Sequence, residues 1–172
     1  MNAASSHRVW RLGVNIDTDA LAPGHAMKHG TDTIARHCLE SIRPEFARQV
    51  RPGDVIVAGA NFGIGSSREQ AAAVLVQLGV AAVIAPSYSG LYFRNAFNLG
   101  LLLLTCAEAT VLREGDRIAI DIVRPALVAP DGRLLACEPV PGFLMDMVRA
   151  GGLLNQLRQR AGRPAFTKAP DV

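Results

Sequence analysis

Apolar and polar positions fall along this chain in blocks that predict strands and helices in turn. Continuous apolar runs at residues 54–58, 80–85 and 101–104 have the length of buried strands. Between them, residues 70–78 and 91–98 have the pattern of helices. A strand, a helix and a second strand in succession predict a β-α-β unit with parallel strands and a right-handed crossover. The pattern therefore indicates an α/β fold.

The flanks of this core follow a different pattern. Residues 9–14 show some alternation and predict a first strand, whereas residues 117–122 alternate clearly and predict a strand with one buried face. A turn at residues 130–133 leads to a further apolar segment at residues 134–137. We therefore expect a hairpin-like β addition to the α/β core.

Other helices and loops follow from the positions of proline and glycine. Residues 21–30 contain one proline and two glycines and predict a loop. Short helices are predicted at residues 31–36 and 44–50, the second with a proline in its first turn. An amphipathic helix is predicted at residues 141–149, and residues 153–160 extend it.

The composition favours one domain. Of the 172 residues, 49% are hydrophobic and 5% aromatic, which suits a sheet of aliphatic strands covered by helices. We expect a single domain over residues 1–160 and a disordered tail over residues 161–172, which contain two prolines. The net charge of +3 is spread without a basic run, so nucleic-acid binding is not indicated. No apolar stretch reaches the length of a membrane span, so a membrane partner is not indicated either.

The cysteines and the N-terminal residues predict the compartment. Cys38, Cys106 and Cys137 are widely separated, show no C-x-x-C spacing, and predict neither a disulfide framework nor a metal site. Each is expected to be a small buried residue. The first eight residues lack the apolar segment of a secretory signal. We expect a cytoplasmic protein whose own residues bind no metal and no cofactor.

A glycine-rich turn at residues 59–69 separates the first buried strand from its helix and carries the most chemistry. Such a turn leaves backbone N–H groups pointing outward, and the helix dipole and Arg68 add positive charge, so it predicts an anion-binding site. A Ser66 hydroxyl in that setting could act as a base or nucleophile. The alternative is that Ser66 and Glu69 form a capping box that only satisfies the helix N-terminus.

Two further segments carry candidate ligands. The sequence Asn-Ile-Asp-Thr-Asp at residues 15–19 places two carboxylates around a hydroxyl, which could orient catalytic groups or bind a cation. The alternative is a turn held by local Asx-type hydrogen bonds. His25 and His29 stand four residues apart, as metal ligands on a helix do. The flanking glycines disfavour a helix and no third ligand lies between them, so no metal site is predicted.

These motifs resemble the small subunit of 3-isopropylmalate dehydratase and, more widely, the aconitase swivel-domain family. The resemblance rests on Asn-Phe-Gly-x-Gly-Ser-Ser-Arg-Glu at residues 61–69, on Asn-x-Asp-Thr-Asp at residues 15–19, and on the strand and helix of residues 82–101. It implies an aconitase-like swivelling β/β/α three-layer domain with a mixed, partly parallel sheet.

The resemblance also implies a reaction, namely dehydration and rehydration of a 2-hydroxy acid, with 2-isopropylmalate converted to 3-isopropylmalate in leucine biosynthesis. The family's [4Fe–4S] cluster belongs to a separate large subunit, so the chain is expected to act in a heterodimer or heterotetramer, and homo-oligomers are one alternative for the isolated chain. By motif position, Ser66 is the base and Asp19 a second catalytic residue. The substrate-binding residues implied are Ser67, Arg68, Thr18, Asn61, Gly63, Gly65, His25, Ala26 and Met27.

One loop departs from the family. Its members usually read Pro-x-(Arg/Lys)-(Tyr/Phe)-Leu where this chain has Pro-Gly-His-Ala-Met at residues 23–27. A substrate of the homoaconitate, citraconate or methylmalate, or dimethylmalate type is therefore an alternative. A second alternative is a phosphate- or nucleotide-binding module without chemistry. For a dinucleotide fingerprint, however, Arg68 replaces the third glycine, and the P-loop Gly-Lys-Ser/Thr is missing.

Overall fold

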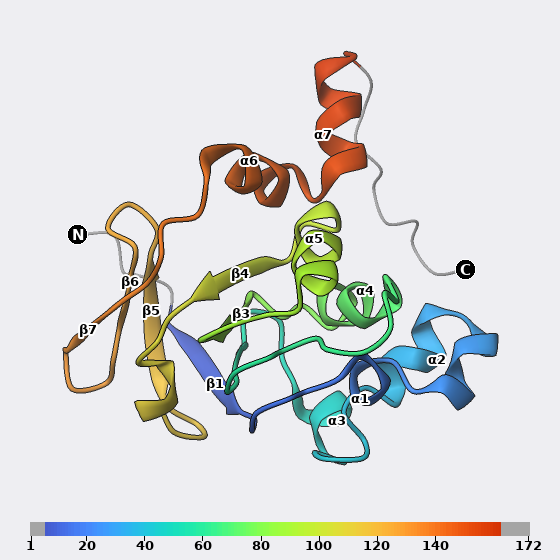
Figure 1. The fold of residues 1–172 in the computed structure, drawn as a ribbon, viewed down its shortest axis with the longest axis horizontal. Helices are drawn as coiled ribbons and strands as arrows, with labels where there is room; N and C mark the ends of the chain where they lie inside the picture. The colour runs from blue at the N-terminus through green and yellow to red at the C-terminus, as the bar shows by residue number, and fades with distance from the viewer. Residues whose placement is uncertain (1–5, 163–172) are drawn as a thin grey trace.

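The structure is a computed structural model that describes residues 6–162. Its strands are β1 (His7–Arg11), β2 (Val55–Val57), β3 (Ala82–Ala85), β4 (Leu102–Thr105), β5 (Arg117–Asp121), β6 (Ala126–Val128) and β7 (Leu134–Ala136). They form a seven-stranded sheet in the order β4-β3-β2-β1-β5-β6-β7 (Figure 1). The sheet is mixed, because β1 to β4 run parallel and β5 to β7 are antiparallel. The predicted fold class is confirmed.

The parallel half forms the buried centre. Val9, Val55, Ala82 and Leu102 stand in register across β1, β2, β3 and β4, and all four are buried. Strands covered on both faces require continuous apolar runs, which is why these segments do not alternate. Helix α4 (Gln70–Gln77) connects β2 to β3, as the predicted β-α-β unit requires.

The antiparallel half differs from the prediction in one strand. We expected residues 117–122 to pair directly with residues 134–137, but β6 lies between β5 and β7, and the turn at residues 130–133 joins β6 to β7. The hairpin prediction was wrong because β6 has only three residues, too few for alternation to show. Its central residue, Leu127, is completely buried.

The helices cover the parallel half, with β5 to β7 on the opposite side of the molecule from α1 and α2 (Figure 1). Helix α4 packs against α2 and α5, and α5 in turn packs on β4 and α6. Of the described helices, none has the length and apolar character that a bilayer span requires. Apart from α4, the helical segments are α1 (Thr18–Leu21), η1 (Gly24–His29), α2 (Thr31–Arg36), α3 (Phe46–Gln49), α5 (Gly90–Asn98), η2 (Ala109–Val111), α6 (Gly142–Ala150) and α7 (Leu153–Arg160).

Three predictions about helices and loops change. Residues 15–19 and 21–30 are not simple loops, since α1 and the 3₁₀ helix η1 lie within them. Residues 153–160 do not extend α6, because Gly151 (φ 76°) and Gly152 (φ 110°) turn the chain out of the helix before α7 begins. The predicted tail lies outside the described residues from residue 163 onward.

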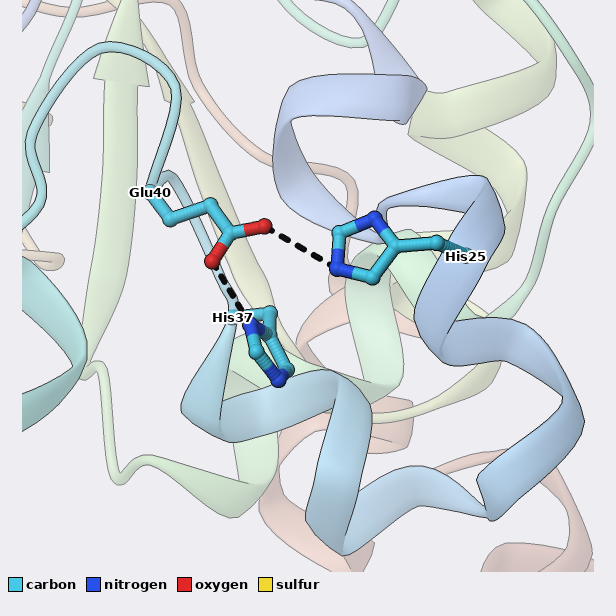
Figure 2. Close-up of side chains that lie close together, drawn as sticks. All are labelled: His25, His37 and Glu40. Carbon is cyan, nitrogen blue, oxygen red and sulfur yellow. Dashed lines mark hydrogen bonds and ion pairs between the residues drawn. The ribbon is translucent and has the colours of Figure 1, made fainter.

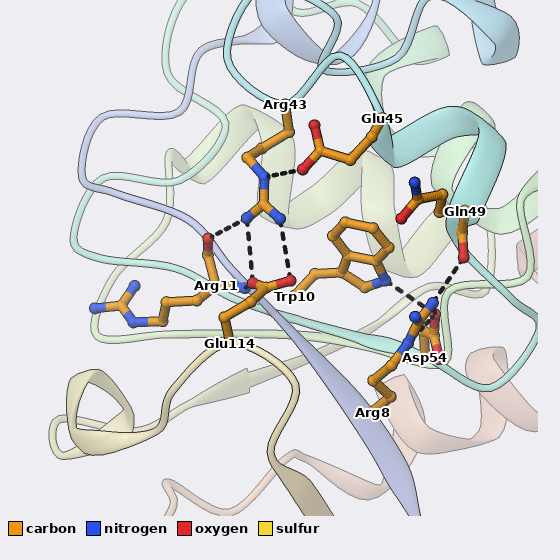
Figure 3. Close-up of polar contacts among 8 residues, drawn as sticks. All are labelled: Arg8, Trp10, Arg11, Arg43, Glu45, Gln49, Asp54 and Glu114. Carbon is orange, nitrogen blue, oxygen red and sulfur yellow. Dashed lines mark hydrogen bonds and ion pairs between the residues drawn. The ribbon is translucent and has the colours of Figure 1, made fainter.

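A polar network holds β1 against the start of β2 (Figure 3). Asp54 accepts hydrogen bonds from Trp10 Nε1 at 2.9 Å and from Arg8 Nη2 at 2.5 Å. Burial by itself would raise the pKa of Asp54, but these hydrogen bonds outweigh it and lower the pKa below the ordinary value. The guanidinium of Arg43 lies over the Trp10 ring and pairs with Glu114. The strand that leads into residues 15–19 is therefore tied to Asp54 at the start of β2 and packed against the Arg43–Glu114 pair.

Candidate active site

The loops that follow β1, β2 and β3 meet at the carboxyl edge of the parallel strands, where α/β sheets bind ligands. Asp17 in the first loop bridges Ile64 in the second, and Phe62 in the second bridges Tyr88 in the third. The Thr18 N–H donates to the Ile64 carbonyl at 2.8 Å. The structure therefore brings the two predicted motifs side by side.

Thr18 joins these motifs through its side chain. It is 2% exposed, and its Oγ1 accepts a 3.0 Å hydrogen bond from the Ser66 backbone N–H. Asp17 places Thr18 at the first position of α1, because its side chain accepts from the Ala20 N–H and caps the helix. The local-bonding interpretation thus holds for Asp17, whereas Thr18 and Asp19 make contacts with the glycine-rich turn.

Asp19 and Arg68 form an ion pair at the surface. Arg68 Nη1 donates to Asp19 Oδ1 at 2.7 Å and to the Ala22 carbonyl at 2.9 Å. The hydrogen bond from Arg68 is the main reason that the pKa of Asp19 is lowered, and the Gly24 N–H adds to it. Asp19 is therefore a carboxylate throughout the neutral range, and it holds one edge of the Arg68 guanidinium in place.

The predicted capping box does not form. Helix α4 begins at Gln70, and Glu69 occupies its N-cap in a helical conformation without a side-chain cap bond. Ser66 lies further upstream, and its N–H is used by Thr18. Ser66 and Ser67 are both exposed. Ser66 and Glu69 therefore do not form the capping box that the Ser-x-x-Glu spacing indicated. The hydroxyls of Ser66 and Ser67 both remain accessible.

Three other residues of the turn shape its backbone. Gly63 has φ 79°, and a Cβ there would lie 2.1 Å from the Tyr92 ring. A Cβ on Gly65, which has φ 102°, would lie 3.1 Å from Thr18 Oγ1. Asn61, at φ 62°, donates from Nδ2 to Asn15 Oδ1 at 2.9 Å. These three predicted substrate-binding residues have sufficient packing and conformational reasons for their identity.

The predicted recognition loop lies alongside the Asp19–Arg68 pair. In η1, a Cβ on Gly24 would lie 3.6 Å from Asp19 Oδ1. Its next residue, His25, is exposed, whereas Ala26 is buried and Met27 packs against the core. His25 therefore offers the most accessible side chain of the three.

His25 forms a group with residues other than His29, the histidine four residues away for which no metal site was predicted. His25 contacts Glu40, which also contacts His37 (Figure 2). Sequence reasoning missed His37 and Glu40, although their His-x-x-Glu spacing directly after α2 was a usable signal. His29 is not a member of this group.

Neither the cysteines nor the groove beside α5 supplies a residue to this site. Cys38, Cys106 and Cys137 are free thiols, and within residues 6–162 they do not gather into a set of three metal ligands. An open groove of about 870 Å³ runs between α5, α6 and α7, and neither Ser66 nor Arg68 lines it. The candidate site is thus an open surface and not a closed pocket of this chain.

Comparison with known proteins places the chain in a family. The model of the aconitase C-terminal domain matches residues 20–109. The 3-isopropylmalate dehydratase small subunit of Nautilia profundicola is 44% identical over 150 residues, which are 86% of this chain and 90% of that protein. The small subunit 1 of Archaeoglobus fulgidus is 40% identical over 159 residues, which are 90% of this chain and 99% of that protein.

The solved structures agree. The crystal structure of 3-isopropylmalate dehydratase from Methanocaldococcus jannaschii superposes with a TM-score of 0.85 at 37% identity, covering 91% of this chain and 94% of that one. Residues 20–109, which match the family model, include the glycine-rich turn and the helices on either side of it. With these matches over nearly the whole length, the chain belongs to the family of 3-isopropylmalate dehydratase small subunits, which carries the aconitase C-terminal domain.

Proposed function

We propose that this chain is the small subunit of a cytoplasmic hydro-lyase that converts 2-isopropylmalate to 3-isopropylmalate in leucine biosynthesis. The observation that carries the proposal is the pair of contacts that joins the two family motifs, Thr18 to Ser66 and Asp19 to Arg68. These contacts assemble a hydroxyl, a guanidinium and a carboxylate on one surface. The names of the relatives support the same reaction.

A large subunit completes the site in this proposal. Ser66 and Ser67 are exposed, so this chain alone does not exclude water from the reacting groups. The cysteines of this chain do not form a cluster-binding set, which fits a [4Fe–4S] cluster held by the partner. When bound there, the cluster supplies the Lewis acid for the departing hydroxyl. The complex is a heterodimer or a heterotetramer of the two kinds of subunit.

Each residue has a specific role in the proposal. Ser66 acts as an alkoxide, whose negative charge Arg68 and the N–H groups of the turn stabilise, and its Oγ then takes the proton from the substrate carbon beside a carboxylate to become a neutral hydroxyl. Arg68 also binds a substrate carboxylate through its planar guanidinium. Asp19 has a lowered pKa and is therefore a poor base near neutral pH, so its role is to position Arg68. Thr18 positions Ser66.

The substrate side chain is recognised from η1. His25 is the exposed residue of this segment, while Met27 is partly buried and Ala26 has no accessible surface to offer. Since the basic and aromatic positions of the usual loop are replaced here, another substituted malate is the main competing substrate. The Asn61, Gly63 and Gly65 positions support binding by shaping the turn, and Ser67 adds a second hydroxyl.

The proposal is tested by reconstitution. The chain is mixed with the anaerobically reconstituted iron–sulfur large subunit from the same organism, and turnover is measured on 2-isopropylmalate, citrate, homocitrate and methyl-substituted malates. We expect turnover only with both chains, and a preference for 2-isopropylmalate. A preference for another acid would reassign the substrate while keeping the reaction class.

The base is tested in the same assay with Ser66→Ala. General-base removal is expected to lower kcat by about 10²–10⁴-fold while the two subunits still associate. Ser41→Ala, at an exposed serine outside this site, is the matched control and should retain full activity. Normal turnover by Ser66→Ala would rule out its role as the base.

A further inference from the structure

Two imidazoles and one carboxylate, those of His25, His37 and Glu40, converge on one another (Figure 2). Glu40 lies between the two histidines, with Oε1 3.1 Å from His25 Nε2 and Oε2 2.6 Å from His37 Nδ1. The two rings lie edge to face with their centroids 5.0 Å apart. One ligand atom from each of the three residues lies within 4.8 Å of the others.

The backbone holds these three side chains together independently of any ligand. His37 is the C-cap residue of α2, and the turn that follows carries Glu40. Between them, Cys38 and Leu39 are completely buried, and the Leu39 N–H donates to the Ala20 carbonyl at 2.8 Å. Leu39 adopts φ 61°, a conformation that a leucine keeps only when its surroundings require it. The relative positions of His37 and Glu40 are therefore set by the core.

His25 is held on the other side of the cluster by η1. Its neighbour Ala26 is buried, and the Ala26 N–H donates to the Pro23 carbonyl at 3.0 Å. The cluster thus spans two segments that approach each other in the fold, η1 and the turn after α2. A group that bound all three side chains would fasten η1 to that turn.

We propose that His25, His37 and Glu40 form a binding site for a divalent transition-metal ion, with Zn²⁺ as the best match. Two neutral imidazoles and a carboxylate are a ligand set that Zn²⁺ uses, with a fourth position left open. In a tetrahedral zinc site two such ligand atoms lie about 3.4 Å apart, given bond lengths of about 2.1 Å. The three ligand atoms lie within 4.8 Å of one another, so an ion would have to draw the most distant pair together by about 1.4 Å at most.

The cluster is open enough for an ion to enter. The side chain of His25 is 62% exposed, that of His37 39% and that of Glu40 37%. One of its three residues, His25, is also the exposed residue of η1 that we propose to recognise the substrate side chain. Because η1 continues from the segment that carries Asp19, a bound ion would restrain the segment that we propose to recognise the substrate side chain.

The test is a metal titration of the full chain alone, so it does not depend on turnover or on the large subunit. The protein is stripped with a chelator and titrated with Zn²⁺ in competition with a chromophoric chelator. We expect one equivalent to bind with micromolar or tighter affinity, and Mg²⁺ not to compete. Co²⁺ in the same site should give the visible absorption of a tetrahedral centre.

Matched variants decide whether these three residues are the ligands. His25→Gln, His37→Gln and Glu40→Gln should each weaken Zn²⁺ binding at least tenfold, with unchanged circular dichroism. His29→Gln removes a histidine from η1 outside the cluster, and Cys137→Ser removes the least buried thiol; both should bind Zn²⁺ normally.

Two results would overturn the proposal. The first is an absence of stoichiometric Zn²⁺ binding by the folded protein, which would leave the cluster as an imidazole–carboxylate hydrogen-bonded group. The second is unchanged binding by the His25→Gln/His37→Gln double variant, which would place the ion elsewhere. Because the side chains of His25 and His37 are both largely or partly exposed, the double variant is expected to fold.

Discussion

Thr18 Oγ1 accepts a hydrogen bond from the Ser66 N–H across 48 residues of sequence. The acceptor is buried at the start of α1, and the donor lies in an exposed turn. The position of the proposed base therefore depends on a residue of the first motif that need not itself touch the substrate.

The first prediction separates the hydroxyl of Thr18 from its shape. Thr18→Val keeps the shape and loses the acceptor, so the Ser66 backbone loses its restraint. We expect kcat to fall by about 10–100-fold, because small displacements of a reacting group are costly. Thr18→Ser keeps the oxygen and should retain most of the activity. Equal activity of Thr18→Val and wild type in steady-state assays would contradict the positioning role.

The second prediction concerns pH and the Asp19–Arg68 pair. The folded-state pKa of Asp19 is lowered, so the ion pair is complete above the ordinary Asp pKa of about 3.9 and is lost only as the pH falls through the lowered value. Between pH 5 and 9 the pair should therefore not titrate. We expect Asp19→Asn to raise KM about tenfold without moving either limb of the kcat/KM–pH profile in that range. Disappearance of a limb in this variant would instead make Asp19 a titrating catalytic group.

The third prediction is a stability effect far from the site. Asp54→Ala leaves Arg8 and the Trp10 Nε1–H without their buried acceptor, and we expect a loss of about 3–5 kcal/mol in urea unfolding. Because the folded pKa of Asp54 is lowered, its contribution is complete above about pH 3.9 and disappears as the pH falls through the lowered value. Asp146→Ala, which breaks the exposed pair with Arg149, should cost less than about 1 kcal/mol.

The fourth prediction tests why Gly63 is a glycine. In Gly63→Ala the new Cβ would lie 2.1 Å from the Tyr92 ring and the residue would keep φ 79°. Overpacking and left-handed strain together should cost about 2–5 kcal/mol. Gly90→Ala is the control, because a Cβ there meets nothing within 4 Å, and thermal unfolding should show it unchanged or slightly stabilised. A stable but inactive Gly63→Ala protein would instead support close approach of a ligand at this position.

The pattern of apolar and polar residues predicted an element correctly wherever one physical requirement determined that element. Buried parallel strands need continuous apolar runs, so β2, β3 and β4 were predictable, and so was the α4 crossover. β6 was not predictable, since its three residues have no readable period. The break between α6 and α7 depends on two glycines whose left-handed conformations the sequence permits without requiring them.

The sequence by itself determined the α/β class, the two motifs and the resemblance that names their chemistry, because these depend on residue type and local order. Only the tertiary structure decided which contact each carboxylate of residues 15–19 makes. Asp17 caps α1, and Asp19 pairs with Arg68, 49 residues away. It also decided that His25 meets His37 and Glu40 instead of His29. The physical reason is that such contacts depend on how loops from neighbouring strands align at the sheet edge, which no local spacing encodes.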